Sequence, residues 1–216
     1  MIDFELILPE GWVHIPTTPE LARVRAKMIE AVVRTALPDT LPRDKAGPWR
    51  RVLRRELTDA TDEASRQSAR AVVLPVREFH GVRLPGTMVL TVLEDADMPD
   101  DPKLVLDAIL ADAGPDGVAL EVGGCPAARV RQISDSDALK RKAPSVRVNY
   151  YVAAPDTPGV WALLTFTVLT DGDVEAEPVR AVVLLFDAIV GTLRWADRID
   201  VPTEEEVLEI LEPHDA

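Results

Sequence analysis

Residues 145–195, SVRVNYYVAAPDTPGVWALLTFTVLTDGDVEAEPVRAVVLLFDAIVGTLRW, contain a strand pair and a helix that set the fold class of this chain. The first ten residues alternate between apolar and polar side chains, a turn follows at residues 155–159, and a second extended segment runs from Val160 to Thr170. Side chains in a strand point to opposite faces with a period of two. The stretch therefore predicts an antiparallel hairpin with a core face.

The helix after this hairpin carries one apolar stripe. Its members recur at the spacing of a single helical face and are Val179, Val182, Val183, Phe186, Ile189 and Val190. Pro178 near the start and Gly191 at the end are typical helix boundaries. We expect Phe186, at the centre of the stripe, to pack on the sheet near Leu164 and Phe166.

The second strand of the hairpin is apolar on both of its faces. Trp161, Leu163 and Leu169 alternate with Ala162, Leu164 and Phe166. A strand with this pattern needs cover on both sides. We expect the last helix to cover one face, and a helix at Leu21–Ala36 to cover most of the other. Trp161 is then expected at the edge of the part of this face that the helix leaves uncovered.

The rest of the chain indicates an α+β fold. Further helices are predicted at 49–66 and 103–111, the latter capped by the acidic stretch 94–101, and strands at 4–8, 71–76, 87–93, 118–122 and 127–133. Tight turns join most strands, which favours an antiparallel β-sheet with helices packed on its faces. Residues 1–200 are predicted to form a single α+β domain, and residues 201–216 an acidic C-terminal tail.

Composition limits the classes of partner. The 216 residues carry a net charge of −13, which disfavours binding to nucleic acid or to an anionic membrane surface, and favours a basic or apolar partner. The single cysteine allows no internal disulfide, and residues 1–9 lack the features of a signal peptide. No run approaches the roughly 18 apolar residues of a membrane span. We expect a cytoplasmic protein that is not inserted in a membrane.

The chain shows no catalytic signature. Its three histidines are far apart in sequence, and no nucleotide-binding, nucleophile-elbow or metal-ligand motif occurs. We therefore expect no metal, no cofactor and no enzymatic activity. One catalytic alternative remains, a hydrolase of unknown substrate that uses Cys125, although this cysteine precedes a proline in a Gly-Gly turn.

Two groups of side chains are candidates for a partner-binding surface. The first is the apolar group Trp161, Tyr151 and Leu163, provided that no helix covers it. The second is the basic cluster Arg50, Arg51, Arg54 and Arg55 in the helix at 49–66, which would suit an acidic partner. Glu56, Asp59, Asp62 and Glu63 follow on the same helix, so a self-paired, solvated helix face is the alternative interpretation.

A family resemblance follows from three segments. They are Leu8-Pro9-Glu10-Gly11-Trp12 after the opening strand, Gly159–Thr167 in the hairpin, and Phe186–Leu193 in the last helix. Together they resemble the PsbP-like fold, a superfamily that includes a photosystem II extrinsic subunit, Ran-binding nuclear transport factors, Lpq lipoproteins and the Eag chaperones of bacterial secretion effectors. The resemblance covers about a third of the chain and rests on packing residues. It implies protein binding without catalysis, and it assigns no site residue.

The sequence thus predicts a non-enzymatic protein-binding module, such as a chaperone or adaptor for a bacterial secretion apparatus. Its partner would be another protein or a second copy of this chain. The alternative is a small-molecule-binding domain with a pocket between sheet and helices.

Overall fold

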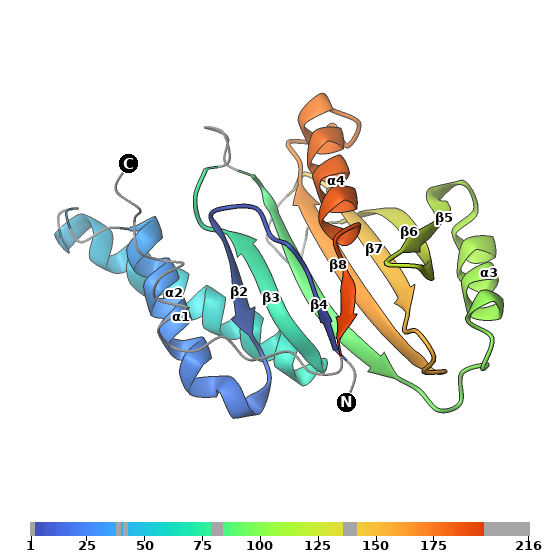
Figure 1. Cartoon of the computed structure of the whole chain (residues 1–216). Coiled ribbons are helices and arrows are strands. Elements are labelled where there is room, and N and C mark those ends of the chain that lie inside the picture. Colours follow the sequence, from blue (N-terminus) through green and yellow to red (C-terminus); the bar gives the residue numbers. More distant parts are fainter. Residues whose placement is uncertain (1–2, 38–39, 41–42, 79–83, 136–141, 197–216) are drawn as a thin grey trace. The chain divides into compact units, whose positions relative to one another are not determined.

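The computed structural model describes residues 3–37, 40, 43–78, 84–135 and 142–196 (Figure 1). The chain divides into two compact units: the first combines Met1–Pro9 with Leu84–Ile199, and the second contains Glu10–Arg83. The single α+β domain over residues 1–200 stays a prediction, and the predicted tail at 201–216 lies outside the described residues. Both units combine helices with antiparallel strands, which confirms the predicted α+β class.

The first unit is built on an antiparallel sheet with the order β4-β8-β7-β6-β5. Its elements are β1 (Asp3–Glu5), β4 (Gly86–Glu94), α3 (Pro102–Ala113), the 3-10 helix η2 (Gly114–Asp116), β5 (Gly117–Val122), β6 (Cys125–Ser134), β7 (Ser145–Ala153), β8 (Val160–Leu169), α4 (Glu177–Val190) and β9 (Arg194–Ala196). Strands β1 and β9 form a separate antiparallel pair. The predicted hairpin is β7–β8, in which Val148 lies opposite Phe166 and Tyr150 opposite Leu164.

Helix α4 covers one face of this hairpin (Figure 1). The side chain of Phe186 is 0% exposed, and its ring centroid lies 3.9 Å from that of Phe166. Tyr150 meets Phe166 edge to face at 5.5 Å, and Leu164 is fully buried on the same face. The predicted position of Phe186 is confirmed.

Helix α3 covers part of the opposite face of β8. The helix begins after Asp101, whose Oδ1 accepts a hydrogen bond from the Lys103 backbone N–H at 2.9 Å, and Pro102 occupies its first position. An aspartate cap and an early proline both favour a helix start. This confirms the expectation that the acidic stretch caps α3.

The second unit has its own apolar core. It consists of β2 (Trp12–Pro16), the 3-10 helix η1 (Pro19–Leu21), α1 (Ala22–Ala36), α2 (Arg43–Arg66) and β3 (Ala69–Pro75), with β2 and β3 antiparallel. Val13 and Ile15 of β2 pack against Met28 and Val32 of α1, and Leu53 of α2 joins them. The predicted helix Leu21–Ala36 thus packs on β2 and α2.

Two boundaries in this unit differ from the sequence-based expectation. Strand β2 begins at Trp12, in a segment predicted only as a turn. Helix α2 begins at Arg43 and continues through Pro48, although the prediction places its start at Trp49. Pro48 has no N–H to bond to the carbonyl of Asp44, so the sequence indicates a break that the tertiary structure overrides.

Replacing Phe186 by alanine should lower the free energy of unfolding by about 3–5 kcal/mol, because it removes a fully buried aromatic ring. Chemical denaturation of the purified protein measures this. Leu184→Ala is the matched control, since Leu184 lies on α4 but is 66% exposed. Its effect should stay within about 0.5 kcal/mol. Similar losses for the two variants would contradict the assigned orientation of α4.

Candidate functional site

The predicted apolar surface around Trp161 is largely covered within the first unit. Trp161 is 3% exposed and belongs to a buried cluster with Leu106 of α3, Ala128 and Ala153. The helix over Trp161 is α3, which corrects the expectation that Trp161 lies at the edge of a face covered mostly by Leu21–Ala36. The physical reason is that α3 follows β4 directly and brings Val105, Leu106, Ile109 and Leu110 to this cluster.

The two other members of the predicted surface are half-buried. Tyr151 packs against the same cluster, and this burial raises the pKa of its phenol. Leu163 lies opposite Tyr151 in the β7–β8 register. Trp161, Tyr151 and Leu163 are therefore brought together as predicted, but mainly as packing residues. Their role in partner binding stays a prediction.

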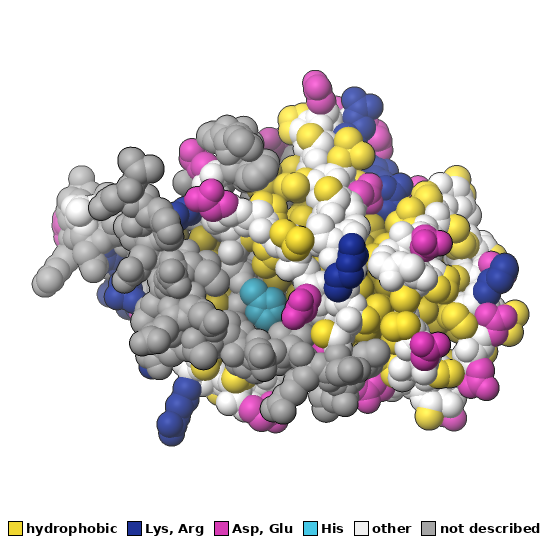
Figure 2. All heavy atoms as spheres, viewed as in Figure 1, with side chains coloured by type: hydrophobic (Ala, Val, Ile, Leu, Met, Phe, Trp, Pro, Cys, Tyr) yellow, Lys and Arg dark blue, Asp and Glu magenta, His cyan; other side chains and the backbone are white. Residues whose placement is uncertain are grey.

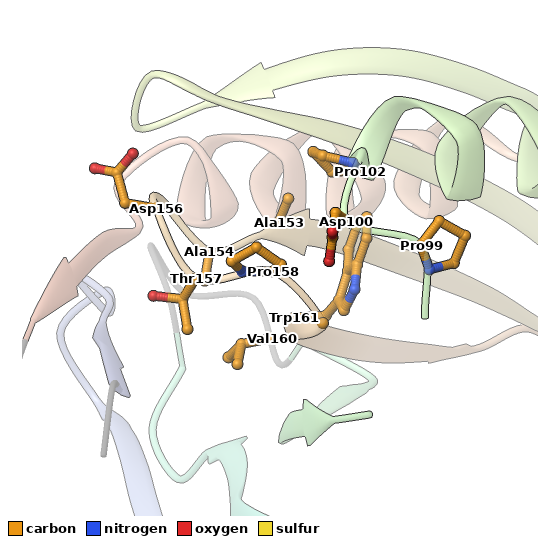
Figure 3. Close-up of a pocket in the computed structure, with 11 residues that line it drawn as sticks. Pro99, Asp100, Pro102, Ala153, Ala154, Asp156, Thr157, Pro158, Val160 and Trp161 are labelled. Carbon is orange, nitrogen blue, oxygen red and sulfur yellow. The ribbon is translucent and has the colours of Figure 1, made fainter. Parts of the chain in front are cut away.

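A small pocket remains beside Trp161, between the start of α3 and the β7–β8 turn (Figure 3). Its volume is about 140 Å³. The lining residues are Pro99, Asp100, Pro102, Ala153, Ala154, Asp156, Thr157, Pro158, Gly159, Val160 and Trp161. The Nε1 atom of Trp161 is buried and has no hydrogen-bond partner among the described residues. Buried indole N–H groups usually have one.

Two arginines of the predicted cluster form contacts between helices, and the other two are exposed. Arg50 and Arg54 connect α2 to α1: Arg50 Nε donates to the carbonyl of Leu37 at 2.9 Å, and Arg54 makes a bidentate ion pair with Glu30, with Nη2 to Oε2 at 2.8 Å. The hydrogen bonds from Arg54 lower the pKa of Glu30. Arg51 and Arg55 are exposed, and Arg55 pairs with its neighbour Glu56 at 3.0 Å. The alternative interpretation, ion pairing within α2, therefore applies to Arg55, whereas Arg54 pairs with Glu30 of α1.

An exposed tryptophan lies on the same helix, α2, as Arg51 and Arg55. Trp49 is 66% exposed, and Val52, one turn along the same helix, is 41% exposed. Residues three apart on a helix are neighbours on its surface. We call Trp49, Arg51, Val52 and Arg55 the α2 surface. The sequence places Trp49 at a helix start without indicating its exposure, because the apolar positions of α2 occupy more than one face.

A second cavity, of about 270 Å³, lies between α4 and strands β5, β6 and β7. It is lined by Val118, Leu120, Glu121, Val122, Arg129, Tyr150, Asp187, Val190 and Gly191. Arg129 Nη1 lies 2.7 Å from Asp187 Oδ2, and the Tyr150 hydroxyl donates to Asp187 Oδ1 at 2.5 Å. Burial, followed by this carboxylate, strongly raises the pKa of Tyr150. In the view of Figure 2, hydrophobic side chains gather over α4 and the neighbouring strands.

The sequence does not indicate this second cavity. Arg129, Tyr150 and Asp187 come from three elements, and no local motif relates them. Arg129 Nε is buried without a hydrogen-bond partner in the described part of the chain. The cavity fits the place, between sheet and helix, where the small-molecule alternative expects a pocket.

The structure lends little support to a nucleophilic cysteine. Cys125 is buried at the start of β6, and desolvation, followed by the charges of Asp156 and Glu121, raises the pKa of its thiol. A thiol with a raised pKa forms less of the reactive thiolate. Within the described ranges, no three histidine, cysteine or carboxylate side chains are grouped to hold a metal ion. None of the described helices combines the length and apolar character of a membrane span.

Comparisons with known proteins concern the fold. No family model and no curated protein matches the sequence. The chain is similar to the solved structure of LpqN, described as involved in cell envelope biogenesis of Mycobacterium tuberculosis, with 15% identity, a TM-score of 0.44, and coverage of 90% of this chain and 84% of LpqN. It is also similar to the Saccharomyces cerevisiae Ran-binding protein Mog1p, with 14% identity, a TM-score of 0.38, and coverage of 59% and 79%.

Lpq proteins and Ran-binding factors are two of the groups that the sequence resemblance names. At these scores the similarity assigns no function and no site residue.

Trp161→Ala should destabilise the protein by about 3–5 kcal/mol, because the indole fills the cluster under α3. Denaturant unfolding measures the loss, and Trp161→Phe, which keeps an aromatic ring in place, should retain most of the stability. A fully stable Trp161→Ala protein would show that α3 does not depend on this contact.

The Glu30–Arg54 pair predicts a pH dependence. The folded-state pKa of Glu30 is depressed, so its stabilising contribution is present above the unfolded value of 4.5 and is lost as the pH falls through the folded value. Glu30→Gln should remove this part of the acid sensitivity. Denaturant unfolding measures the free energy of unfolding of both proteins between neutral and acidic pH. An equal pH dependence in the original and Glu30→Gln proteins would contradict this prediction.

Proposed function

We propose that the chain is a non-enzymatic protein-binding module and that the α2 surface is its contact with a partner. The observation that carries this proposal is the exposed side chain of Trp49 next to Val52, on a helix that also exposes Arg51 and Arg55. Tryptophan and arginine are enriched among the residues that contribute most to binding at protein interfaces. A tryptophan left 66% exposed in the free protein is a suitable anchor for a partner.

The charge of α2 indicates the chemistry of the partner. Residues 43–55 of the helix include six basic residues and one acidic residue, in a chain whose net charge is −13. They are Arg43, Lys45, Arg50, Arg51, Arg54, Arg55 and Asp44. Electrostatic complementarity at an interface favours the correct partner and accelerates encounter. We therefore expect an acidic protein segment with an apolar side chain that packs on Trp49.

A finer proposal concerns the biological setting. The sequence resemblance to a superfamily that includes the Eag chaperones supports a role as a chaperone or adaptor for a bacterial secretion apparatus, acting in the cytoplasm. Expression in the native host with and without the chain tests this. The level or export of a secreted protein should fall in its absence, and cell fractionation should place the chain in the cytoplasmic fraction.

A second candidate function rests on the cavity between α4 and the sheet. Arg129, Tyr150 and Asp187 give it a small polar group, and Val118, Leu120, Val122 and Val190 give it apolar walls. Most small-molecule sites combine these two features, at volumes from about 300 Å³ upward. A thermal-shift screen separates this function from protein binding, since a ligand raises the melting temperature by mass action. Arg129→Lys should reduce the shift.

Trp49→Ala should weaken partner binding by about 2 kcal/mol or more, as expected for an interface anchor, without changing stability. Affinity capture with quantitative mass spectrometry identifies the partner, and calorimetry with the purified partner measures the affinity. Arg51→Glu with Arg55→Glu should weaken binding further at low salt, because these charges face the partner.

Two control variants match these changes. Leu184→Ala removes an equally exposed apolar side chain from α4, and Arg180→Glu reverses an exposed arginine on the same helix. Both should retain the partner. Binding that survives Trp49→Ala, or is lost equally in the controls, would contradict the α2 surface. If the captured partner is a second copy of the chain, light scattering should show a dimer that Trp49→Ala dissociates.

A further inference from the structure

Strand β5 is the last strand of the sheet and has one neighbour (Figure 1). It pairs with β6 over Gly117–Val122, and no other described strand pairs with it. The free edge of a strand carries a row of unpaired backbone N–H and C=O groups. Ala119 and Glu121 are exposed, so helix α3 leaves this part of the edge open.

The register with β6 shows which backbone groups of β5 point outward. Both glycines of the turn at residues 123–124 have positive φ, which is typical of a two-residue hairpin. Val122 and Cys125 flank this turn as a hydrogen-bonded pair, and bonded pairs alternate with unbonded ones in an antiparallel ladder. Every second residue back from Val122 therefore bonds to β6, whereas the backbone groups of Ala119 and Glu121 point away from it.

Pro126 supports this assignment independently. It lies opposite Glu121, and proline has no N–H to donate to a ladder. The pair of Glu121 and Pro126 therefore belongs to the unbonded ones. Among the described residues, none bonds to the backbone of Ala119 or Glu121 on the outer side. The edge thus presents donors and acceptors at a spacing of two residues.

Both ends of β5 are fixed, so this edge is preformed. At the start of the strand, the N–H of Gly117 donates to the carbonyl of Gly114. At the turn, a Cβ on Gly123 would lie 2.9 Å from the carbonyl oxygen of Leu193, so the turn packs closely on this backbone. Exposed edges are usually blunted by proline, lysine or a bulge. Strand β5, with the sequence GVALEV and an unbroken register, has none of these.

The cavity of about 270 Å³ beside α4 lies on one face of the same strand. Val118, Leu120 and Val122 line it, because alternate side chains of a strand share a face. Val118 is 37% exposed, so this apolar wall is incompletely covered. A strand added beside β5 would place every second side chain on this face, next to Val118 and Leu120. The unpaired edge and the apolar cavity therefore suit the same occupant.

We propose that an extended segment of another protein adds to the sheet along the free edge of β5. Its backbone bonds to Ala119 and Glu121, as in other cases of strand addition. Its alternate apolar side chains pack on Val118 and Leu120 and cover the cavity. A basic side chain lies opposite Glu121, the single charged residue of β5, because opposite charges that face each other across two strands stabilise their pairing.

Charge favours a segment of another protein over a second copy of this chain. Two β5 strands paired antiparallel about Ala119 would place Glu121 of each copy opposite Gly117 and next to Asp116 of the other. Like charges in such positions are destabilising. Each copy also carries a net charge of −13, which adds to the repulsion.

This edge does not depend on the functions proposed above. The α2 surface belongs to the other unit and shares no residue with β5, so Trp49→Ala should leave strand addition unchanged. A small molecule bound in the cavity would contact side chains and would leave the backbone N–H of Ala119 unpaired. The proposals therefore fail separately.

NMR titration of the full chain with the peptide acetyl-Lys-Val-Thr-Val-Thr-amide tests the edge. In an antiparallel pairing its lysine lies opposite Glu121 and its valines lie opposite Leu120 and Val118. At saturation, hydrogen exchange should slow severalfold at the amides of Ala119 and Glu121. The amide of Leu120, which already bonds to β6, should be unchanged. This alternation is the signature of an added strand.

Two control peptides separate strand addition from general adhesion. Proline in place of the middle threonine removes the donor to the Ala119 carbonyl and should weaken binding about tenfold or more. Glutamate in place of lysine should weaken binding severalfold, because it faces Glu121.

Variants of the chain test the same contacts. Ala119→Pro removes an outward N–H and keeps the ladder to β6, so the strand should stay folded and peptide binding should fall about tenfold or more. Ala119→Val is the matched control, since it keeps the N–H and should retain binding. Val118→Asp places a charge on the apolar face and should weaken binding about tenfold.

Four results would overturn the proposal. They are protection of the Ala119 amide already in the free chain, equal binding of the threonine and proline peptides, unchanged binding in Ala119→Pro, and equal slowing of exchange at Ala119 and Leu120. The proline peptide keeps the test valid if Ala119→Pro does not fold. A dimer in light scattering that Ala119→Pro dissociates would also overturn it, because a second copy would then cover the edge.

Discussion

Strand β8 is apolar on both faces, and the first unit is arranged around the cover that this strand requires. On one face Leu164, Phe166 and Val168 are fully buried, and Phe186 of α4 stacks on Phe166 with centroids 3.9 Å apart. On the other face α3 closes over Trp161. Two helices from different parts of the chain are needed because neighbouring side chains of a strand point to opposite sides.

The incomplete cover on the α3 side creates the pocket at Trp161. Helix α3 starts at Pro102, and the turn 154–160 meets the acidic stretch before it through the contact between Asp95 and Gly159. Between these turns the indole is covered without its N–H being paired. The same packing that buries Trp161 therefore leaves a small hollow between the turn 154–160 and the start of α3.

Charge is distributed unevenly in this acidic protein. The first half of α2 is basic, and two of its arginines, Arg50 and Arg54, are engaged with Leu37 and Glu30 of the neighbouring segment. Arg51 and Arg55 remain exposed on the same helix as Trp49. Surface ion pairs contribute little to stability.

The sequence alone determined the α+β class, the β7–β8 hairpin, the stripe of α4 and the place of Phe186, because these follow from local periodicity and from short connections. It also indicated that both faces of β8 are buried and that Trp161, Tyr151 and Leu163 lie together. Only the tertiary structure decided which helix covers Trp161, because periodicity shows that a face is apolar without showing its partner. The tertiary structure also decided that Trp49 is exposed and that only some arginines of the cluster are bonded. It likewise brought Arg129, Tyr150 and Asp187 into contact. Each depends on contacts between residues far apart in the chain, which no local pattern records.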